Sequence, residues 1–206
     1  MINLLTLLDP DSMVISQMKV ITKTKKMRDI KTWEERIRPK IMEDFSLRIQ
    51  KDLETIPPPN DLPEIESCFI YGKIHTGKTI LAAWMYVEAC RQQFMSITHE
   101  TIEFVKISEF FNQIKRSYDD PELSEQTILD RYSETDILFF DDFGMERPTD
   151  WALSLLYLLV DRRYENLKTT IFTSNHSLGQ IAEKFGDDRI TSRIQRMCKV
   201  IHKTKF

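Results

Sequence analysis

The sequence of 206 residues predicts an α/β fold with a five-stranded, mostly parallel sheet flanked by helices. Three observations predict this fold. Short apolar runs alternate with segments of helical periodicity in the last two thirds of the chain. Several of these runs are apolar at every position, as in strands buried on both faces. A glycine-containing turn joins the first run directly to a helix-forming segment. With 41% hydrophobic residues, the chain is long enough for one such core and a short extension.

The first part of the chain predicts a helical extension that ends in a proline-rich linker. Residues 33–53 have apolar side chains at helical spacing, so we expect one amphipathic helix there. Four prolines between Ile56 and Pro63 exclude a helix interior or a central strand at that point. We therefore expect an N-terminal helical extension with linker at residues 1–61, which would bind a partner protein, and a core domain at residues 62–206. A basic stretch from Lys19 to Arg28 predicts either a solvated arm or an electrostatic contact with nucleic acid.

The core domain predicts regularly alternating elements. Apolar and β-branched runs indicate strands at residues 67–71, 103–107, 136–140, 169–174 and 198–203. Helical periodicity indicates helices near residues 78–92, 109–118, 123–132, 150–166, 178–185 and 188–196. Three local signals mark helix starts: Ser108, Thr149, and the pair Ser177 and Gln180, which has the capping-box spacing.

The turn after the first strand has the pattern G-x-x-x-x-G-K-T. A strand before it and a helix after it favour a nucleotide-phosphate loop over a turn that binds nothing. In such a loop, backbone N–H groups and the helix N-terminus face the phosphates. Lys78 would reach the β- and γ-phosphates, and the Thr79 hydroxyl would serve Mg²⁺. We expect nucleotide contacts from Gly72, Lys73, Ile74, His75, Thr76, Gly77, Lys78, Thr79 and Ile80.

Two carboxylates follow the strand at residues 136–140. Carboxyl ends of parallel strands border the crevice in which open α/β sheets bind ligands. Asp141 would contact Mg²⁺ through its water shell, and Asp142 would orient or deprotonate an attacking water. A turn or a helix cap is the alternative for an Asp-Asp pair taken alone.

Polar residues near the last two strands complete the set. Asn175 follows the strand at 169–174 and would hold the attacking water, with a helix cap as the alternative. Arg193 ends a helix just before the last strand. An arginine there can neutralise charge on a phosphate held by a neighbouring subunit, or it is an ordinary surface residue. Arg189 is a second candidate for the same role.

Composition limits the other function classes. The formal net charge is −3, so nucleic-acid binding would need a local basic patch. The cysteines are Cys68, Cys90 and Cys198, an odd number without paired spacing, which is typical of buried thiols in a reducing compartment. No apolar run approaches the roughly 18 residues that span a membrane, and the N-terminus does not have the pattern of a signal peptide. We therefore expect a cytoplasmic protein with no membrane partner.

The order of these motifs resembles the AAA+ ATPases, and within them the DnaC/DnaI-type helicase loaders and their IstB-like relatives. Residues 72–79 resemble Walker A, residues 139–144 resemble Walker B, residues 173–175 resemble sensor 1, and residues 192–194 resemble the arginine-finger box. The resemblance implies a P-loop AAA+ core that uses ATP and Mg²⁺ and self-associates through its ATP sites. The chain stops at Phe206, directly after the fifth strand, and loaders of this clade lack the C-terminal helical lid.

Two positions depart from the family pattern. His75 stands where many members carry a third glycine, and a residue with a side chain tolerates fewer backbone conformations there. Asp142 replaces the glutamate that is common in AAA+ proteins. A shorter base must sit closer to its water, so we expect slow, switch-like turnover.

The resemblance implies an ATP-dependent replication factor that grips single-stranded DNA and delivers a replicative helicase. The alternative is an IstB-like ATPase that assists transposition on duplex DNA with a transposase. A nucleotide-dependent adaptor and a small-molecule kinase are lower alternatives. Family logic points to residues 109–132 for DNA, where Lys115 and Arg116 are the candidates. Phe110 and Phe111 suit base stacking, but they equally suit a core-facing helix.

Overall fold

The computed structural model describes residues 27–96, 99–119, 123–144 and 148–205. The chain forms two compact units, one up to Glu43 and one from Asp44 onward. In the first unit lie the π-helix η2 (Trp33–Ile37) and the helix α2 (Arg38–Met42). Positions 1–26, with most of the basic stretch that begins at Lys19, lie outside the described residues. The expectation that residues 1–61 form a partner-binding extension stays a prediction.

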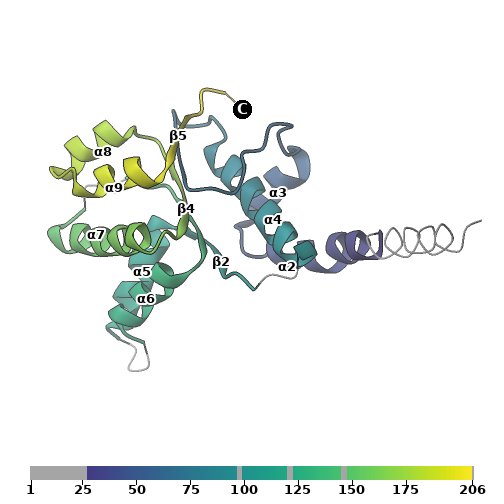
Figure 1. Cartoon of the computed structure of the whole chain (residues 1–206), viewed down its shortest axis with the longest axis horizontal. Helices are drawn as coiled ribbons and strands as arrows, with labels where there is room; N and C mark the ends of the chain where they lie inside the picture. The colour runs from purple at the N-terminus through teal and green to yellow at the C-terminus, as the bar shows by residue number, and fades with distance from the viewer. Residues whose placement is uncertain (1–26, 97–98, 120–122, 145–147, 206) are drawn as a thin grey trace, which may run out of the picture. The chain divides into compact units, whose positions relative to one another are not determined.

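The second unit is built on one parallel sheet (Figure 1). Its strands run in the order β2-β3-β4-β1-β5, and every neighbouring pair is parallel. This confirms the predicted α/β fold with five strands, and each strand begins and ends within one residue of its expected bounds. The strands are β1 (Cys68–Tyr71), β2 (Ile102–Lys106), β3 (Ile137–Asp141), β4 (Thr169–Ser174) and β5 (Lys199–His202).

Helices cover both faces of the sheet (Figure 1). On one face lie α3 (Leu47–Thr55) and α4 (Lys78–Ser96), and Tyr86 of α4 packs edge-on against Phe139. Phe140 points to the opposite face, where it joins a buried cluster with side chains of five helices. These helices are α5 (Ile107–Ser117), α6 (Glu125–Glu134), α7 (Asp150–Glu165), α8 (Leu178–Phe185) and α9 (Arg189–Met197). None of the helices in the described ranges has the length and apolar character to cross a membrane.

The expectation of a single helix over residues 33–53 is wrong. Helix α2 ends at Met42, and α3 begins after Ser46, whose ψ of 151° is extended. Between them, Phe45 is 5% exposed and packs edge-on against Tyr86, with the ring centroids 5.3 Å apart. The Tyr86 hydroxyl also donates to Asp44 at 2.5 Å. These contacts with α4 hold the chain in a turn, so helical periodicity alone missed the break.

Two of the three predicted helix starts are confirmed. Thr149 caps α7 by accepting a hydrogen bond from the backbone N–H of Ala152 at 3.3 Å. Ser177 and Gln180 form the expected capping box at the start of α8. The prediction for Ser108 is wrong, because α5 already begins at Ile107.

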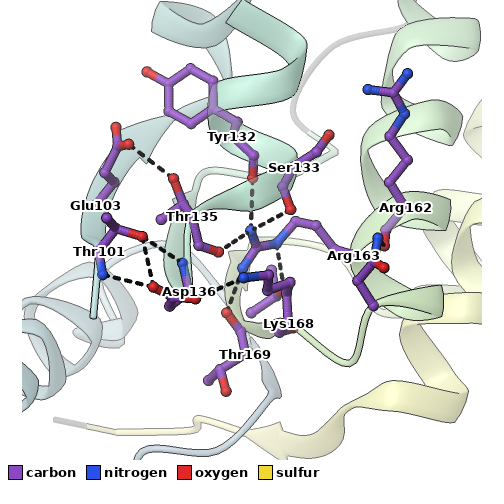
Figure 2. Close-up of polar contacts among 12 residues, drawn as sticks. Thr101, Glu103, Tyr132, Ser133, Thr135, Asp136, Arg162, Arg163, Lys168 and Thr169 are labelled. Carbon is purple, nitrogen blue, oxygen red and sulfur yellow. Dashed lines mark hydrogen bonds and ion pairs between the residues drawn. The ribbon is translucent and has the colours of Figure 1, made fainter. Parts of the chain in front are cut away.

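A buried arginine closes the amino ends of β3 and β4 (Figure 2). The Arg163 side chain is 1% exposed and donates to the backbone carbonyls of Tyr132, Thr135 and Thr169 at 2.7, 2.6 and 2.7 Å. Its Nε donates to the Thr170 hydroxyl at 2.8 Å. Burial lowers the pKa of Arg163 to about 10. One side chain therefore joins α6, α7, β4 and the segment that leads into β3.

A second set of polar contacts lies beside it (Figure 2). Asp136 accepts from Lys168 Nζ at 2.7 Å and from the backbone N–H of Thr101 at 2.9 Å. The Thr101 hydroxyl donates to the same carboxylate at 3.0 Å. We call the contacts of Arg163, Asp136, Lys168 and Thr101 the amino-end network. It fixes the starts of β2, β3 and β4 relative to one another.

Candidate functional site

The opposite ends of the strands form a cavity of about 410 Å³. Because β3, β4 and β1 are neighbours in the sheet, their carboxyl ends and the turns that follow meet at this edge. The structure brings together there nine of the residues that the sequence singled out: Ile74, His75, Gly77, Lys78, Thr79, Ile80, Asp141, Asp142 and Asn175. The other residues of the wall are Ser46, Arg48, Ile49, Asp52, Ile56 and Lys106, whereas Gly72, Lys73 and Thr76 of the predicted nucleotide contacts do not line this cavity.

Gly72 and Gly77 of the loop are each needed for a different physical reason. Gly77 has a φ of 80°, which a residue with a side chain rarely adopts. At Gly72, a Cβ atom would lie only 2.0 Å from the backbone carbonyl oxygen of Lys203. This glycine is therefore required by close packing against the chain after β5. His75 has a φ of 65°, so a residue with a side chain adopts the left-handed conformation here, at a free-energy cost of about 1 kcal/mol.

Lys78 is held inside the loop. Its side chain is 6% exposed, and its Nζ donates to the carbonyl oxygen of Lys73 at 2.8 Å. The Thr76 hydroxyl donates to the same oxygen at 2.9 Å. Burial lowers the pKa of Lys78, while the charges of Asp142 and Asp141 oppose this shift. The loop therefore combines a cation with the N-terminus of α4, an arrangement that suits a phosphate group.

Asp141 is buried at the end of β3 with one oxygen occupied and one not. Its Oδ1 accepts hydrogen bonds from the hydroxyls of Thr79 at 2.9 Å and Thr173 at 2.5 Å. Its Oδ2 is buried and has no hydrogen-bond partner within the described part of the chain. Burial raises the pKa of Asp141, and the hydrogen bond from Thr173 opposes the rise. A buried carboxylate oxygen without a donor calls for a cation or a water.

The donor set therefore fits Mg²⁺. The hydroxyl of Thr79 and the carboxylate of Asp141 are the hard oxygen ligands that this ion prefers. Across the described ranges, no group of three or more His, Cys, Asp or Glu side chains could hold a metal. An ion at Asp141 would thus depend on one carboxylate, one hydroxyl, water and nucleotide phosphates, which is common for Mg²⁺ in nucleotide sites.

Asp142 lies in the turn after β3 in a strained conformation. Its φ is 62°, and its N–H donates to the Thr173 hydroxyl at 3.1 Å. The left-handed region costs an aspartate of the order of 1 kcal/mol and persists where surrounding contacts fix it. The same residue also lines a second cavity of about 680 Å³, to which Phe111 and Lys115 of α5 and Trp151 of α7 contribute.

Asn175 lies in the wall of the 410 Å³ cavity, directly after β4. The helix-cap alternative for this residue is wrong, because the N-cap of α8 is Ser177. Its contact with an attacking water stays a prediction.

The two candidate arginines lie on α9, outside the 410 Å³ cavity. Arg193 forms an ion pair with Asp161, and its Nη2 donates to the Tyr157 hydroxyl at 2.8 Å. Its guanidinium lies 4.6 Å from the centroid of the Tyr157 ring. Arg189 lies over the same ring at 4.9 Å and pairs with Asp187 at 2.7 Å. The ring and the carboxylates thus orient both side chains, and a role in a neighbouring subunit stays a prediction.

The candidate DNA residues are exposed on α5. Lys115 lines the 680 Å³ cavity, and Arg116 lies 3.8 Å from a carboxylate oxygen of Glu109. Phe110 is fully buried, so the core interpretation of this aromatic side chain is confirmed. Phe111 is half-buried and packs against Trp151 at 5.9 Å between ring centroids. Contact of Lys115 and Arg116 with DNA stays a prediction.

Sequence reasoning missed the roles of three residues at the site. Thr173 contacts both carboxylate residues, but four of the six residues of β4 are threonine or serine, so its position in the sensor-1 resemblance gave no distinct signal for these contacts. Arg48 and Asp52 of α3 line the cavity although they precede the loop by twenty residues or more. No local pattern indicates their position, since it depends on how α3 packs beside α4.

Comparisons with protein families, curated proteins and solved structures each find proteins similar to this chain. A model of the family described as IstB-like ATP binding protein matches residues 12–206. The replicative helicase loader DnaI of Bacillus subtilis (strain 168) is 27% identical over 127 residues, which cover 61% of this chain and 38% of that protein. The replicative helicase loader DnaC of Escherichia coli (strain K12) is 22% identical over 131 residues, covering 64% and 51%. The chain thus matches about half or less of the length of these curated relatives.

Solved structures with the same fold include a crystal structure of the DnaC helicase loader. It aligns with a TM-score of 0.56 at 24% identity and covers 76% of this chain and 86% of that one. AMPPCP-bound DnaA from Aquifex aeolicus aligns with a TM-score of 0.56 at 17% identity, covering 79% and 49%. At these identities the likeness establishes the fold.

Proposed function

Because the chain belongs to the family of IstB-like ATP-binding proteins and has an AAA+ P-loop fold, we propose that it hydrolyses ATP as a slow molecular switch. One observation carries this proposal. Lys78, Thr79, Asp141 and Asp142 line one cavity, and one hydrogen bond joins the loop threonine to the first carboxylate. This arrangement supports a phosphate-binding cation, a pair of magnesium ligands and a base within one site.

In the proposed reaction, Lys78 and the N-terminus of α4 hold the β- and γ-phosphates. Thr79 and Asp141 would hold Mg²⁺, and the ion would supply neutralisation of phosphate charge. Asn175 orients a water molecule, and Asp142 accepts its proton as the water oxygen bonds to the γ-phosphorus. The bond from that phosphorus to the bridging oxygen breaks, and the products are ADP and inorganic phosphate. Arg193 of a neighbouring copy stabilises the developing charge.

The proposed biological role is that of a cytoplasmic DNA replication factor that loads a replicative helicase. Two relatives that match this chain, DnaI and DnaC, are replicative helicase loaders, and this supports the role. Residues 1–61 would bind the helicase, and copies would assemble through their ATP sites. Lys115 and Arg116 would contact single-stranded DNA through its phosphates, which are recognised without regard to sequence.

A second candidate role is assistance to DNA transposition on duplex DNA, with a transposase as the partner. The family description, IstB-like, favours this candidate. Both roles use the same ATP site, so the type of DNA that stimulates hydrolysis separates them. In a nucleotide-dependent adaptor, by contrast, Asp142→Asn would leave partner binding and release unchanged. In a hydrolytic switch, the same variant still binds ATP but no longer hydrolyses it.

The test is ATP hydrolysis by the full chain without DNA, with single-stranded DNA and with duplex DNA. Wild type is compared with Lys78→Ala and Arg193→Ala. We expect stimulation by single strands that both variants lose; stimulation by duplex alone favours the transposition role, and hydrolysis that persists in Lys78→Ala contradicts the ATPase assignment. Mixing the two inactive variants tests the shared site. Interfaces that pair an intact Lys78 with an intact Arg193 should restore part of the activity, whereas no restoration contradicts a role of Arg193 in trans.

A further inference from the structure

We propose that Thr173 is the positioning residue that holds both carboxylate residues of the site in place. This inference rests on the proposed function. The side chain lies at 1% exposure near the carboxyl end of β4. Its hydroxyl donates to Asp141 Oδ1 at 2.5 Å and accepts from the backbone N–H of Asp142 at 3.1 Å. One hydroxyl thus uses its donor and an acceptor position on two successive residues of the site.

The contact with Asp141 determines which oxygen remains for a metal ion. Oδ1 accepts hydroxyl donors from two separate elements, Thr79 of α4 and Thr173 of β4. Two donors from different elements fix the plane of the carboxylate. Oδ2 is then the oxygen that has no donor within the described residues. Thr173 therefore presents Oδ2 to Mg²⁺ by occupying the other oxygen.

The contact with Asp142 supports a strained backbone. With a φ of 62°, Asp142 needs surrounding contacts that hold the left-handed conformation. Thr173 supplies two of them, because its carbonyl oxygen also accepts the next N–H, that of Phe143, at 2.8 Å. Ser174 adds a third by donating its hydroxyl to the carbonyl oxygen of Phe143 at 2.6 Å. The turn that carries the candidate base is thus docked on β4.

The place of Thr173 in the strand links two functions. Asn175, the candidate contact of the attacking water, follows two residues later in the chain. A displacement of β4 at Asn175 would therefore also displace the hydroxyl that orients Asp141 and supports Asp142. In this arrangement the γ-phosphate, the metal ion and the base are coupled through a single strand.

The test compares Thr173→Val with Thr173→Ser. Valine keeps the branched shape but lacks the hydroxyl, whereas serine keeps the hydroxyl and loses a methyl group. Thr191→Val is the matched control, since Thr191 is 5% exposed on α9 and its hydroxyl donates to Asp188 O at 3.0 Å, away from the cavity. The primary readout is the Mg²⁺ concentration for half-maximal binding of a fluorescent ATP analogue, which needs no hydrolysis. The second readout is kcat.

We expect Thr173→Val to raise the required Mg²⁺ concentration at least about tenfold and to lower kcat by a similar or larger factor. Thr173→Ser and Thr191→Val should stay within about threefold of wild type. A Thr173→Val protein that keeps the wild-type Mg²⁺ requirement overturns the inference, and so does a serine variant as impaired as the valine variant. If Thr173→Val does not fold, Thr173→Cys replaces it. Its thiol is a weak donor, so a Mg²⁺ requirement equal to that of the serine variant also overturns the inference.

The two proposals fail in different ways. A wild-type protein that binds ATP with Mg²⁺ but does not hydrolyse it refutes the ATPase assignment. The Mg²⁺ requirement for binding still decides the role of Thr173 in that case, because it reports the orientation of Asp141 before any chemical step.

Discussion

The amino ends and the carboxyl ends of β3 and β4 differ in how far their buried charged groups are hydrogen-bonded. At the amino ends, the guanidinium of Arg163 donates to four backbone carbonyls and one hydroxyl. Within the described residues, a buried atom without a hydrogen-bond partner there is an uncharged hydroxyl oxygen, that of Ser133. At the carboxyl ends, Asp141 has a buried carboxylate oxygen without a partner in the described part of the chain, and Asp142 has a strained backbone.

This difference separates stabilising from functional polar groups. A buried network whose charged member is fully paired rigidifies the fold. A buried carboxylate with a free lone pair and a left-handed aspartate both cost stability in the absence of a ligand. The same two strands thus carry a structural clamp at one end and a site prepared for a metal ion at the other. Substitutions at four positions, one of them with a matched control at a fifth, test this contrast.

The largest expected effect is that of Arg163→Met. It removes the guanidinium donor from four backbone carbonyls and the Thr170 hydroxyl, so we expect the free energy of unfolding to fall by about 3 kcal/mol. Urea denaturation measures the change. Arg162→Met is the matched control, because the neighbouring Arg162 forms a partly exposed ion pair with Asp130 and points away from Arg163 (Figure 2). It should cost about 0.5 kcal/mol. Equal losses in the two variants would contradict a special role of Arg163.

Asp141→Asn should have the opposite sign. The substitution removes a buried charge whose Oδ2 has no partner, so we expect the nucleotide-free protein to gain about 1 kcal/mol of stability. Added ATP and Mg²⁺ should stabilise wild type but no longer stabilise the variant to the same extent. Thermal unfolding with and without both ligands measures these changes. A destabilised nucleotide-free variant would mean that the charge of Asp141 is satisfied within the fold.

Asp136→Asn applies the same substitution just before β3 and should destabilise by about 1 kcal/mol at pH 7, after discounting for partial exposure. Lys168, followed by the backbone N–H of Thr101, lowers the pKa of Asp136 from 3.8 to about 2. Because the pKa of this carboxyl is lower in the folded state than in the unfolded state, its ionised form stabilises the fold at pH values above the unfolded-state pKa. This contribution disappears as the pH falls toward 2. Wild type and variant should therefore converge in stability between pH 4 and pH 2. A constant difference over that range would refute this assignment.

The smallest effect is expected for His75→Gly, at a position whose φ is 65°. His75→Gly relieves strain but increases the entropy of the unfolded chain, so the net change should stay below about 0.5 kcal/mol. His75→Val should cost about 1–2 kcal/mol, because a β-branched residue is strongly disfavoured at positive φ. Melting temperatures of the two variants measure the difference. If valine is tolerated as well as glycine, the loop does not need the left-handed conformation.

The sequence alone was sufficient for the strands and for most of the candidate site. Continuous apolar runs such as Ile137–Phe140 and the pattern around Lys78 are short-range signals, and the rule for carboxyl ends of parallel strands then locates Asp141 and Asp142. Helix starts at Thr149 and Ser177 also follow from local hydrogen bonds. These features depend on residues only a few positions apart.

Features that depend on contacts between residues far apart in the chain could not be predicted from the sequence. The break before α3 depends on Phe45 and Asp44 meeting Tyr86, some forty residues later. The hydrogen bonds of Arg163 and of the Thr173 hydroxyl form only when α7, β3 and β4 pack together. The left-handed conformation of Asp142 likewise follows from its contacts with β4, since aspartate as a residue type does not require it.

The close approach of Gly72 to the Lys203 carbonyl has a consequence for how this lineage diverges. A loop glycine is usually interpreted as a sign of nucleotide binding, but Gly72 is required by backbone packing. A descendant that lost its ligand would be free to replace Lys78, while selection for folding alone would still retain Gly72. Persistence of that glycine among degenerate copies would therefore record the architecture of the sheet, and loss of the lysine would record loss of the activity.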